Sequence, residues 1–435
     1  MKEKKVLPLV LTMSYPMAIS MAVNALYNIV DSFFVAQLDV KAMTALSLLF
    51  PVQNLSHSAA VGFAIGINAT VAFYLGQKNG ELADRAVSSG TMLSVIHGFM
   101  LTAVCIAVMP WFLSMFTDDA VITNYGIEYS QYVFLFAPMD CMFLTCEKIF
   151  QSTGRMKTTM FCLAAGCITN IILDPLMIFG IGPFPQLGIR GAAIATGIGQ
   201  SLPVLIYIAL YVLKPLPVRF RIQYCRPELY MIKRLYSIGN AATLNLALPS
   251  VQISVLNAIL SSFSSGYVFV LGVYYKLQTF LYLSANGVVQ GIRPLVGYNY
   301  GAGRNDRVRE IVKIATITVA CIMLAGTAVC LLIPARLMGI FTDDEAIISI
   351  GASAVRIISA GFIISSLPVI LSGALEGLGK GTASLMISLI RYIIVILPLA
   401  FLLSRLSGAF GVWHSFWLTE IVAAAVSYLI YRVTV

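Results

Sequence analysis

The chain has 435 residues, of which 59% are hydrophobic and only 11% are charged, and its formal net charge is +9. A soluble domain carries about 25% charged residues, so this composition excludes an ordinary soluble protein and predicts an integral membrane protein. Long apolar runs favour membrane-spanning helices over the short alternating strands of a barrel. Because Lys and Arg lie mainly in the loops between these runs, the positive charge indicates membrane topology and not nucleic-acid binding.

Hydropathy and helix-breaking residues predict twelve membrane-spanning helices. The apolar segment after the basic start is too long for a signal peptide, so we interpret it as a retained first helix. The fold class is therefore all-α, integral to the membrane. In chain order the predicted spans cover about 6–36, 40–74, 82–109, 121–151, 157–180, 190–213, 229–260, 267–300, 306–334, 346–376, 382–405 and 409–433.

The basic residues of the loops orient these spans. With the amino terminus inside, the inner segments hold 19 Lys and Arg residues and the outer loops hold 4. Inner loops of membrane proteins carry the excess of Lys and Arg. Both termini are therefore predicted to be cytoplasmic.

The two halves of the sequence repeat at a constant offset. "GFAIGINATVAFYLG" (62–76) matches "GVVQGIRPLVGYNYG" (287–301), and "FTDD" at 116–119 recurs at 341–344 with the same offset. Each repeat holds six spans, so the halves are predicted to be parallel lobes, an architecture typical of secondary transporters. The predicted domains are an amino-terminal lobe (1–213), a cytoplasmic linker (214–228) and a carboxy-terminal lobe (229–435).

An ordered set of motifs resembles one family. "YNIVDSFFVAQL" in the first span, "QSTGRMK" after the fourth, "NIILDP" in the fifth, "GAAIATGIGQ" in the sixth and "QGIRPLVGYNYGAGR" in the eighth are similar to the MATE (multidrug and toxic compound extrusion) family. The chain looks closest to the DinF-like and MepA-like bacterial branches. The resemblance implies a twelve-helix, two-lobed antiporter that exports cationic or amphiphilic compounds in exchange for H⁺ or Na⁺.

Polar residues at one depth predict a coupling site in the first lobe. Counted from the outer ends of their spans, Asp31, Asp174 and Thr196 lie about 7–9 Å below the outer boundary. Asn170 lies one turn deeper than Asp174 on the same helix face. Two carboxylates, an amide and a hydroxyl can bind a proton or Na⁺. Pro175 frees a backbone carbonyl one turn back, which can assist coordination.

The family resemblance adds a role to four of these positions and to Pro16 in the first span. Asp31, Asn170, Asp174 and Thr196 match the ion site of DinF-like MATE proteins, and Pro16 matches their kink proline. Applied to the two aspartate positions, the repeat offset reaches leucines, so the second lobe lacks both acids. Four further intramembrane residues are weaker candidates for lining the substrate cavity: Asp140, Lys276, Arg293 and Glu420.

We therefore predict a secondary antiporter coupled to H⁺ or Na⁺ that exports small molecules, with organic cations as substrates. A flippase for lipid-linked precursors, or an exporter of one specific metabolite, is the alternative. The intramembrane cations Lys276, Arg293 and Arg356 favour the flippase. We expect no cofactor other than the coupling ion, since no phosphate-binding glycine loop is present. We expect no enzymatic activity, no further metal site, a monomer, and a multi-pass location in the cytoplasmic membrane.

Overall fold

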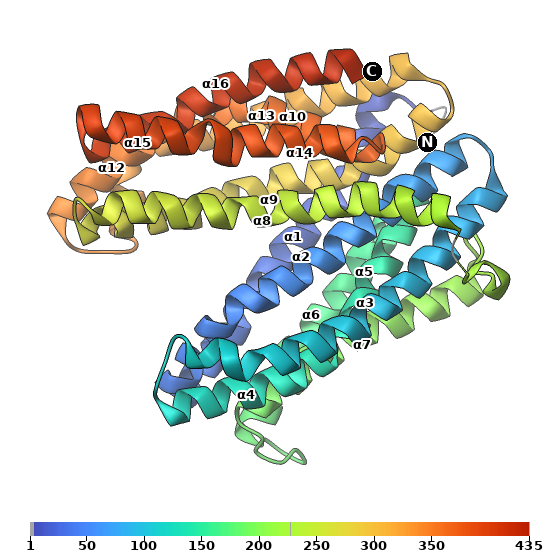
Figure 1. Cartoon of the computed structure of the whole chain (residues 1–435), viewed down its shortest axis with the longest axis horizontal. Coiled ribbons are helices and arrows are strands. Elements are labelled where there is room, and N and C mark those ends of the chain that lie inside the picture. Colours follow the sequence, from blue (N-terminus) through green and yellow to red (C-terminus); the bar gives the residue numbers. More distant parts are fainter. Residues whose placement is uncertain (1–3, 227, 435) are drawn as a thin grey trace. The chain divides into compact units, whose positions relative to one another are not determined.

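The protein is built from helices (Figure 1). The computed structural model describes residues 4–226 and 228–434, and within them every regular element is a helix, as predicted. The first half contains α1 (Val6–Leu38), α2 (Val40–Gly76), α3 (Gly80–Ser114), α4 (Ala120–Leu135), α5 (Ala137–Ser152), α6 (Met156–Phe179) and α7 (Ile189–Leu213). The second half contains the 3-10 helix η1 (Ile222–Tyr224), α8 (Leu229–Ser261), α9 (Ser265–Gly301), α10 (Asn305–Leu332), α11 (Pro334–Gly339), α12 (Glu345–Ser359), α13 (Phe362–Gly377), α14 (Gly381–Leu389), the π-helix η2 (Ile390–Ile394), α15 (Ile396–Ser407) and α16 (Ala409–Thr434).

Each of the twelve predicted spans coincides with one helix or with consecutive helices. In the part of the chain that the structure describes, ten helices are long and apolar enough to cross a membrane. The pair α12 and α13, bent by 54°, makes an eleventh. The remaining predicted span, 121–151, is divided between α4 and α5, each of 16 residues. A hydrocarbon core requires about 20 helical residues, so α4 and α5 must act together if this segment crosses.

The internal repeat recurs in the structure. The break between α4 and α5 falls at Phe136, and the break between α12 and α13 includes Gly361, the position to which the repeat offset carries Phe136. Pro138 at the start of α5 lacks an N–H donor, which suits a helix start and disrupts a continuous helix. The repeated "FTDD" motif ends in a helix cap in both halves. Asp119 accepts a hydrogen bond from Val121 N–H at 2.8 Å, and Asp344 accepts one from Ala346 N–H at 2.9 Å.

The helices form two compact units. One, here the amino-terminal unit, comprises Ile19–Thr243. The other, the carboxy-terminal unit, joins the described residues of Met1–Ala18 to those of Leu244–Val435. The helices α1 and α8 therefore each contribute to both units. The predicted lobe boundaries at 213 and 229 come from the sequence repeat and stay a prediction. The boundaries of the compact units lie elsewhere, inside α1 and α8.

Repeated glycines explain how the units accept these helix segments. In the amino-terminal unit, a Cβ on Gly66 of α2 would lie 2.5 Å from the Leu235 carbonyl oxygen of α8. In the carboxy-terminal unit, a Cβ on Gly291 of α9 would lie 2.7 Å from Ser14 Cα of α1. Real Cβ atoms do not approach backbone this closely, so only glycine fits. The motif that revealed the repeat is therefore the surface on which the shared helices pack.

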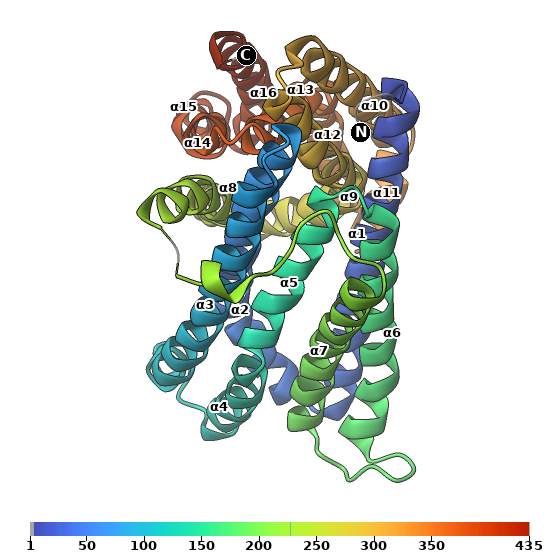
Figure 2. The same ribbon diagram turned by 90° about the vertical axis from the view of Figure 1, so that its right-hand side faces the viewer.

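Within the amino-terminal unit, α2 packs against α3 and α5, and α6 runs along α7 (Figure 2). Its apolar core includes Phe63, Ile67, Tyr207 and Leu235 near one end and Leu49, Met109 and Ile178 near the other. Within the carboxy-terminal unit, α10 packs on α9 and α13, and α16 packs on α13 and α15. Each unit is thus a bundle with its own buried core.

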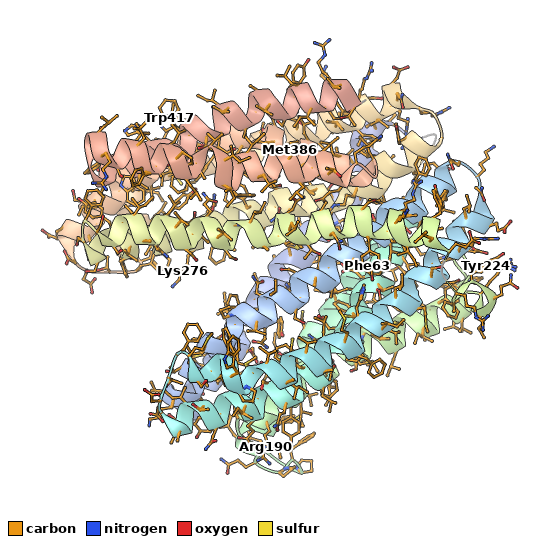
Figure 3. The ribbon with its side chains drawn as sticks, viewed as in Figure 1. Phe63, Arg190, Tyr224, Lys276, Met386 and Trp417 are labelled. Atoms are coloured by element: carbon orange, nitrogen blue, oxygen red, sulfur yellow. The ribbon has the colours of Figure 1, made fainter. Side chains whose placement is uncertain are left out.

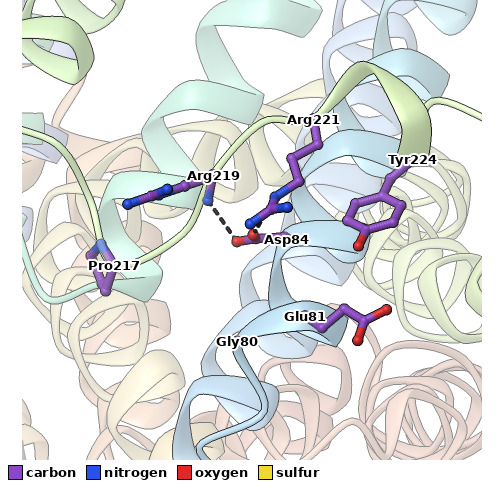
Figure 4. Close-up of a pocket in the computed structure, with 7 residues that line it drawn as sticks. All are labelled: Gly80, Glu81, Asp84, Pro217, Arg219, Arg221 and Tyr224. Atoms are coloured by element: carbon purple, nitrogen blue, oxygen red, sulfur yellow. Dashed lines mark hydrogen bonds and ion pairs between the residues drawn. The ribbon is translucent and has the colours of Figure 1, made fainter.

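The linker after α7 is held by hydrogen bonds to the first turns of α3 (Figure 4). Asp84 accepts hydrogen bonds from the Arg219 N–H at 2.6 Å and from Arg221 Nε at 3.2 Å. Ser88 Oγ accepts a third bond from the Arg221 N–H at 2.9 Å. These contacts border a pocket of about 400 Å³ lined by Gly80, Glu81, Asp84, Pro217, Arg219, Arg221 and Tyr224. Because Asp84 pairs with Arg221, the pocket reflects anchoring of the linker on α3.

Candidate functional site

The four residues predicted to form a coupling site lie together in the amino-terminal unit. Asn170 and Asp174 come from α6, Thr196 from α7 and Asp31 from α1. Asn170 Nδ2 donates to Asp174 Oδ1 at 3.1 Å and lies 3.4 Å from Thr196 Oγ1. The carboxyl groups of Asp31 and Asp174 face each other within hydrogen-bonding range. Asp174 and Asn170 are buried.

Glycines in α6 and α7 explain why these helices meet closely enough. A Cβ on Gly166 would lie 2.4 Å from the Gly199 carbonyl oxygen, and a Cβ on Gly191 would lie 2.5 Å from the Met177 carbonyl oxygen. This contact places Thr196, between the two α7 glycines, beside Asn170. The spacing in "NIILDP" and in "GAAIATGIGQ" therefore positions the polar groups.

Pro175 lies within α6 and does not end it, since the helix continues to Phe179. Proline cannot donate the hydrogen bond that a helix makes one turn back, so the Ile171 carbonyl loses its usual partner. That carbonyl is one residue from Asn170. That this carbonyl assists ion coordination beside Asp174 stays a prediction.

Three oxygens of this cluster lack a donor. Asp31 Oδ1, Asn170 Oδ1 and Asp174 Oδ2 are buried and accept no hydrogen bond from the described residues. Buried polar atoms in native proteins are almost always paired. Two facing carboxylates can bond to each other only when a proton lies between them, and otherwise they require a cation. The donor set of carboxylate, amide and hydroxyl oxygens suits a proton or a hard cation such as Na⁺.

Three residues of the cluster were missed by the sequence prediction. The Tyr129 hydroxyl of α4 lies near the side chains of Gln53 and Thr196 and near both carboxylates. Tyr27 also lies near Asp31 and Asp174. Tyr27 is one helical turn before Asp31, so its place on the same helix face could have been predicted. The positions of Gln53 and Tyr129 depend on how α2, α4 and α7 pack, and no local sequence signal gives this.

Two of the predicted cavity residues form ion pairs in the carboxy-terminal unit. Arg293 Nη2 lies 2.7 Å from Glu376 Oε2, and both side chains are mostly buried. Glu420 Oε1 lies 2.7 Å from Arg391 Nη2. Both pairs join helices of one unit and are separate from the Asp31–Asp174 cluster. Whether Arg293 and Glu420 contact substrate stays a prediction.

The other two predicted cavity residues differ in exposure. Lys276 is exposed on α9 (Figure 3), with its ammonium 5.7 Å from the centre of the Phe341 ring. Asp140 lies in the first turn of α5, and its Oδ2 is 3.2 Å from His57 Nδ1. Neither belongs to the Asp31–Asp174 cluster, so their role in substrate binding also stays a prediction.

Comparison with known proteins identifies relatives over the whole chain. The MatE family model matches residues 16–176 and again residues 242–402, in agreement with the internal repeat. Multidrug export protein MepA of Staphylococcus haemolyticus is 23% identical over 424 residues, covering 97% of this chain and 92% of that protein. MepA of Staphylococcus aureus is 26% identical over 425 residues, covering 96% and 91%.

Solved structures share the fold. A MATE protein crystallised in a bent conformation has a TM-score of 0.91 at 23% identity, with 100% of this chain and 98% of that chain covered. A MOP superfamily transporter from Pyrococcus furiosus, described by a reverse polarity of its binding pocket, has a TM-score of 0.90 at 22% identity and the same coverage. The shared fold and the two matches to one family model agree on the family. The chain belongs to the MatE family, the multidrug and toxic compound extrusion transporters.

Proposed function

We propose that this protein is a cation-coupled antiporter that exports cationic or amphiphilic small molecules. The observation that carries the proposal is the cluster of Asp31, Asn170 and Asp174, in which three buried oxygens lack a donor among the described residues. Such a cluster needs a proton or a cation, and an ionisable group inside a membrane is by default a functional one. The MepA relatives are named multidrug export proteins, which supports the substrate class.

Binding of the coupling ion is proposed to change α1. A proton shared by Asp31 and Asp174, or Na⁺ between them, neutralises the pair and draws α1 and α6 together. Asp31 shares α1 with Pro16, and α1 passes from one compact unit to the other after Ala18. Pro16 is therefore the proposed hinge. Solved MATE relatives described as straight and as bent support a family able to adopt both shapes.

The driving force is adequate for this exchange. Moving one charge through about 100 mV supplies roughly 2.3 kcal/mol. Asp31 and Asp174 share one site, so the pair takes up and releases its ion as a unit. Uptake from the outer side and release to the inner side would complete one alternating-access cycle.

Transport in proteoliposomes tests the proposal. The protein should move a fluorescent organic cation against its own gradient when an H⁺ gradient or an Na⁺ gradient is imposed separately. At least one of the two gradients should support uphill flux, and an ionophore that collapses it should stop the flux. Downhill flux that neither gradient alters would indicate a passive channel and contradict the proposal.

The proposal also places the protein as a monomer in the cytoplasmic membrane with both termini inside. The 19-to-4 excess of basic residues on the inner segments supports this orientation. A cysteine introduced at Asn305 should react with an impermeant thiol reagent only from the cytoplasmic side, and one at Asp118 only from outside. Reversed labelling would overturn the orientation.

The flippase alternative has less support. A flippase for lipid-linked precursors needs free cationic groups for a pyrophosphate, and Arg293 is one such candidate. Its guanidinium is paired with Glu376 in the carboxy-terminal unit. We therefore favour the export of cationic and amphiphilic compounds.

A further inference from the structure

A second charged pair in the amino-terminal unit contains a histidine, whose positive charge depends on pH. His57 Nδ1 lies 3.2 Å from Asp140 Oδ2. Among the ion pairs of the described spans, the others use Arg or Lys, which stay charged at neutral pH. Among these side chains, histidine alone can lose its charge near neutral pH. When His57 is deprotonated, the partner of the Asp140 carboxylate is a neutral imidazole.

The position of His57 is unusual for a polar side chain. It lies near the middle of α2, far from both helix ends, and its side chain is 50% exposed on the protein surface. A half-exposed polar group at mid-span is costly in hydrocarbon and is expected to face water or a translocated ligand. Gln53 lies one turn away on the same face of α2.

The structure also explains why Asp140 can hold a charge here. The break at Phe136 starts α5 within the span, and Asp140 lies in the first turn of that helix. A helix amino terminus carries partial positive charge and stabilises a carboxylate. The Asp140 side chain is 15% exposed, so it is mostly covered by protein but not sealed from its surroundings. The break therefore creates an anionic position that a continuous helix would not favour.

The other charged groups near His57 are already paired. Glu147 and Lys148 of α5 are the remaining charges close to the imidazole among the described residues. Lys148 Nζ lies 3.4 Å from Glu147 Oε2, and Gln151 Nε2 donates to Glu147 Oε1 at 2.6 Å. Because these charges neutralise each other, Asp140 is the charge that a ligand near His57 would meet.

We propose that Asp140 is a substrate-binding carboxylate for organic cations, and that protonated His57 competes with the substrate for it. The ligand class is an amphiphilic amine or quaternary ammonium, phosphonium or similar delocalised cation. When His57 is neutral, the cation pairs with Asp140. When His57 is protonated, the imidazolium takes the carboxylate and the cation is released. This inference rests on the proposed function for its substrate class and adds a site distinct from Asp31 and Asp174.

A line of neighbouring polar side chains leads from this site to the Asp31–Asp174 cluster. Asp174 is bonded to Asn170, and Asn170 contacts Thr196. Tyr129 lies near Thr196 and Gln53, and Gln53 is one turn from His57 on α2. We infer that ion binding at the carboxylate pair can reach the substrate site through these neighbouring groups. Coupling along such a line has to be shown by mutation.

Equilibrium binding of tetraphenylphosphonium to the full-length protein tests the inference. This probe has no titratable group, so any pH dependence comes from the protein. For competition with one proton on the imidazole, the Kd should rise at least about tenfold between pH 7.5 and pH 5.5. H57Q should bind with nearly equal affinity at the two pH values. D140N should bind at least about tenfold more weakly at pH 7.5, and D140E, which keeps the charge, should recover binding.

Controls separate this inference from the proposed function. The chain has three histidines, so H414Q in the carboxy-terminal unit is a matched control that should keep the wild-type pH dependence. If D174N loses the pH dependence and H57Q keeps it, or if D140N binds the probe as wild type does, the inference is wrong. Wild-type binding that is absent, or equal at both pH values, contradicts it as well. Failure of gradient-driven transport with pH-dependent binding intact would instead overturn the proposed function alone.

Discussion

Replacing Asp174 with asparagine is expected to abolish gradient-driven export while the protein stays folded. Asparagine has the same size and keeps an oxygen that can accept the hydrogen bond from Asn170 Nδ2. It cannot bind or release a proton, and it removes one of the two charges that would hold Na⁺. Substrate flux against an imposed H⁺ or Na⁺ gradient in proteoliposomes should fall to that of protein-free vesicles. Size-exclusion chromatography in detergent should show an unchanged profile.

Two companion variants sharpen this expectation. Asp31→Asn should have the same effect, and the double variant should be little worse than either single one, because a shared site is lost only once. Asn257 of α8, in the other compact unit, is near the repeat-equivalent of Asp31, and Asn257→Ala should leave coupled export largely intact. Near-normal coupled transport by well-folded Asp174→Asn would reject the mechanism based on the amino-terminal unit.

Replacing Gly66 with alanine is expected to destabilise the amino-terminal unit strongly. The added methyl group would lie 2.5 Å from the Leu235 carbonyl oxygen and 3.2 Å from the Gly239 backbone nitrogen. Backbone of a packed helix cannot move aside as a flexible side chain would, so α2 and α8 must separate. Overpacking costs about 1–3 kcal/mol or more. Thermal unfolding in detergent should show a lower midpoint and a lower yield of monodisperse protein.

Replacing Gly272 with alanine is expected not to destabilise the protein. Gly272 lies inside α9, and a Cβ there would meet nothing within 4 Å. Alanine is favoured over glycine in a helix interior by about 1 kcal/mol, so Gly272→Ala should leave the midpoint unchanged or raise it. If both alanine variants unfold at the same temperature, the close helix contact at Gly66 is not a determinant of stability.

The local features of this fold were predictable from the sequence. The length of the apolar runs predicted the helices, and the constant spacing between matching motifs predicted the repeat. The clustering of Asp31, Asn170, Asp174 and Thr196 was predicted from helix face and from depth counted along each span. Their role in coupling stays a prediction. Pro138 in the segment 121–151 also carries a signal for the helix break at Phe136, although the segment was predicted as one span.

Features that depend on which helices meet were not predictable in the same way. The charge of Arg293 suggested a free cation, yet Glu376 of another helix, far along the chain, pairs with it. Tyr129 joins the coupling cluster because α4 packs against α2 and α7. Helix periodicity defines which side chains share a face, but it does not define the partner of that face. For the same reason, the sequence could not show that α1 and α8 each belong to two units.

The shared helices have a consequence for biosynthesis. The unit that contains residues 244–434 also includes described residues up to Ala18, which are synthesised well before the rest of that unit. Synthesis proceeds at roughly 5–20 residues per second, so on the order of ten seconds or more passes before the helices that receive this segment exist. Until then, the segment around Ser14 lacks the α9 surface at Gly291 on which it packs. Membrane insertion can therefore be sequential, but neither half of the gene encodes a unit that can complete its packing alone.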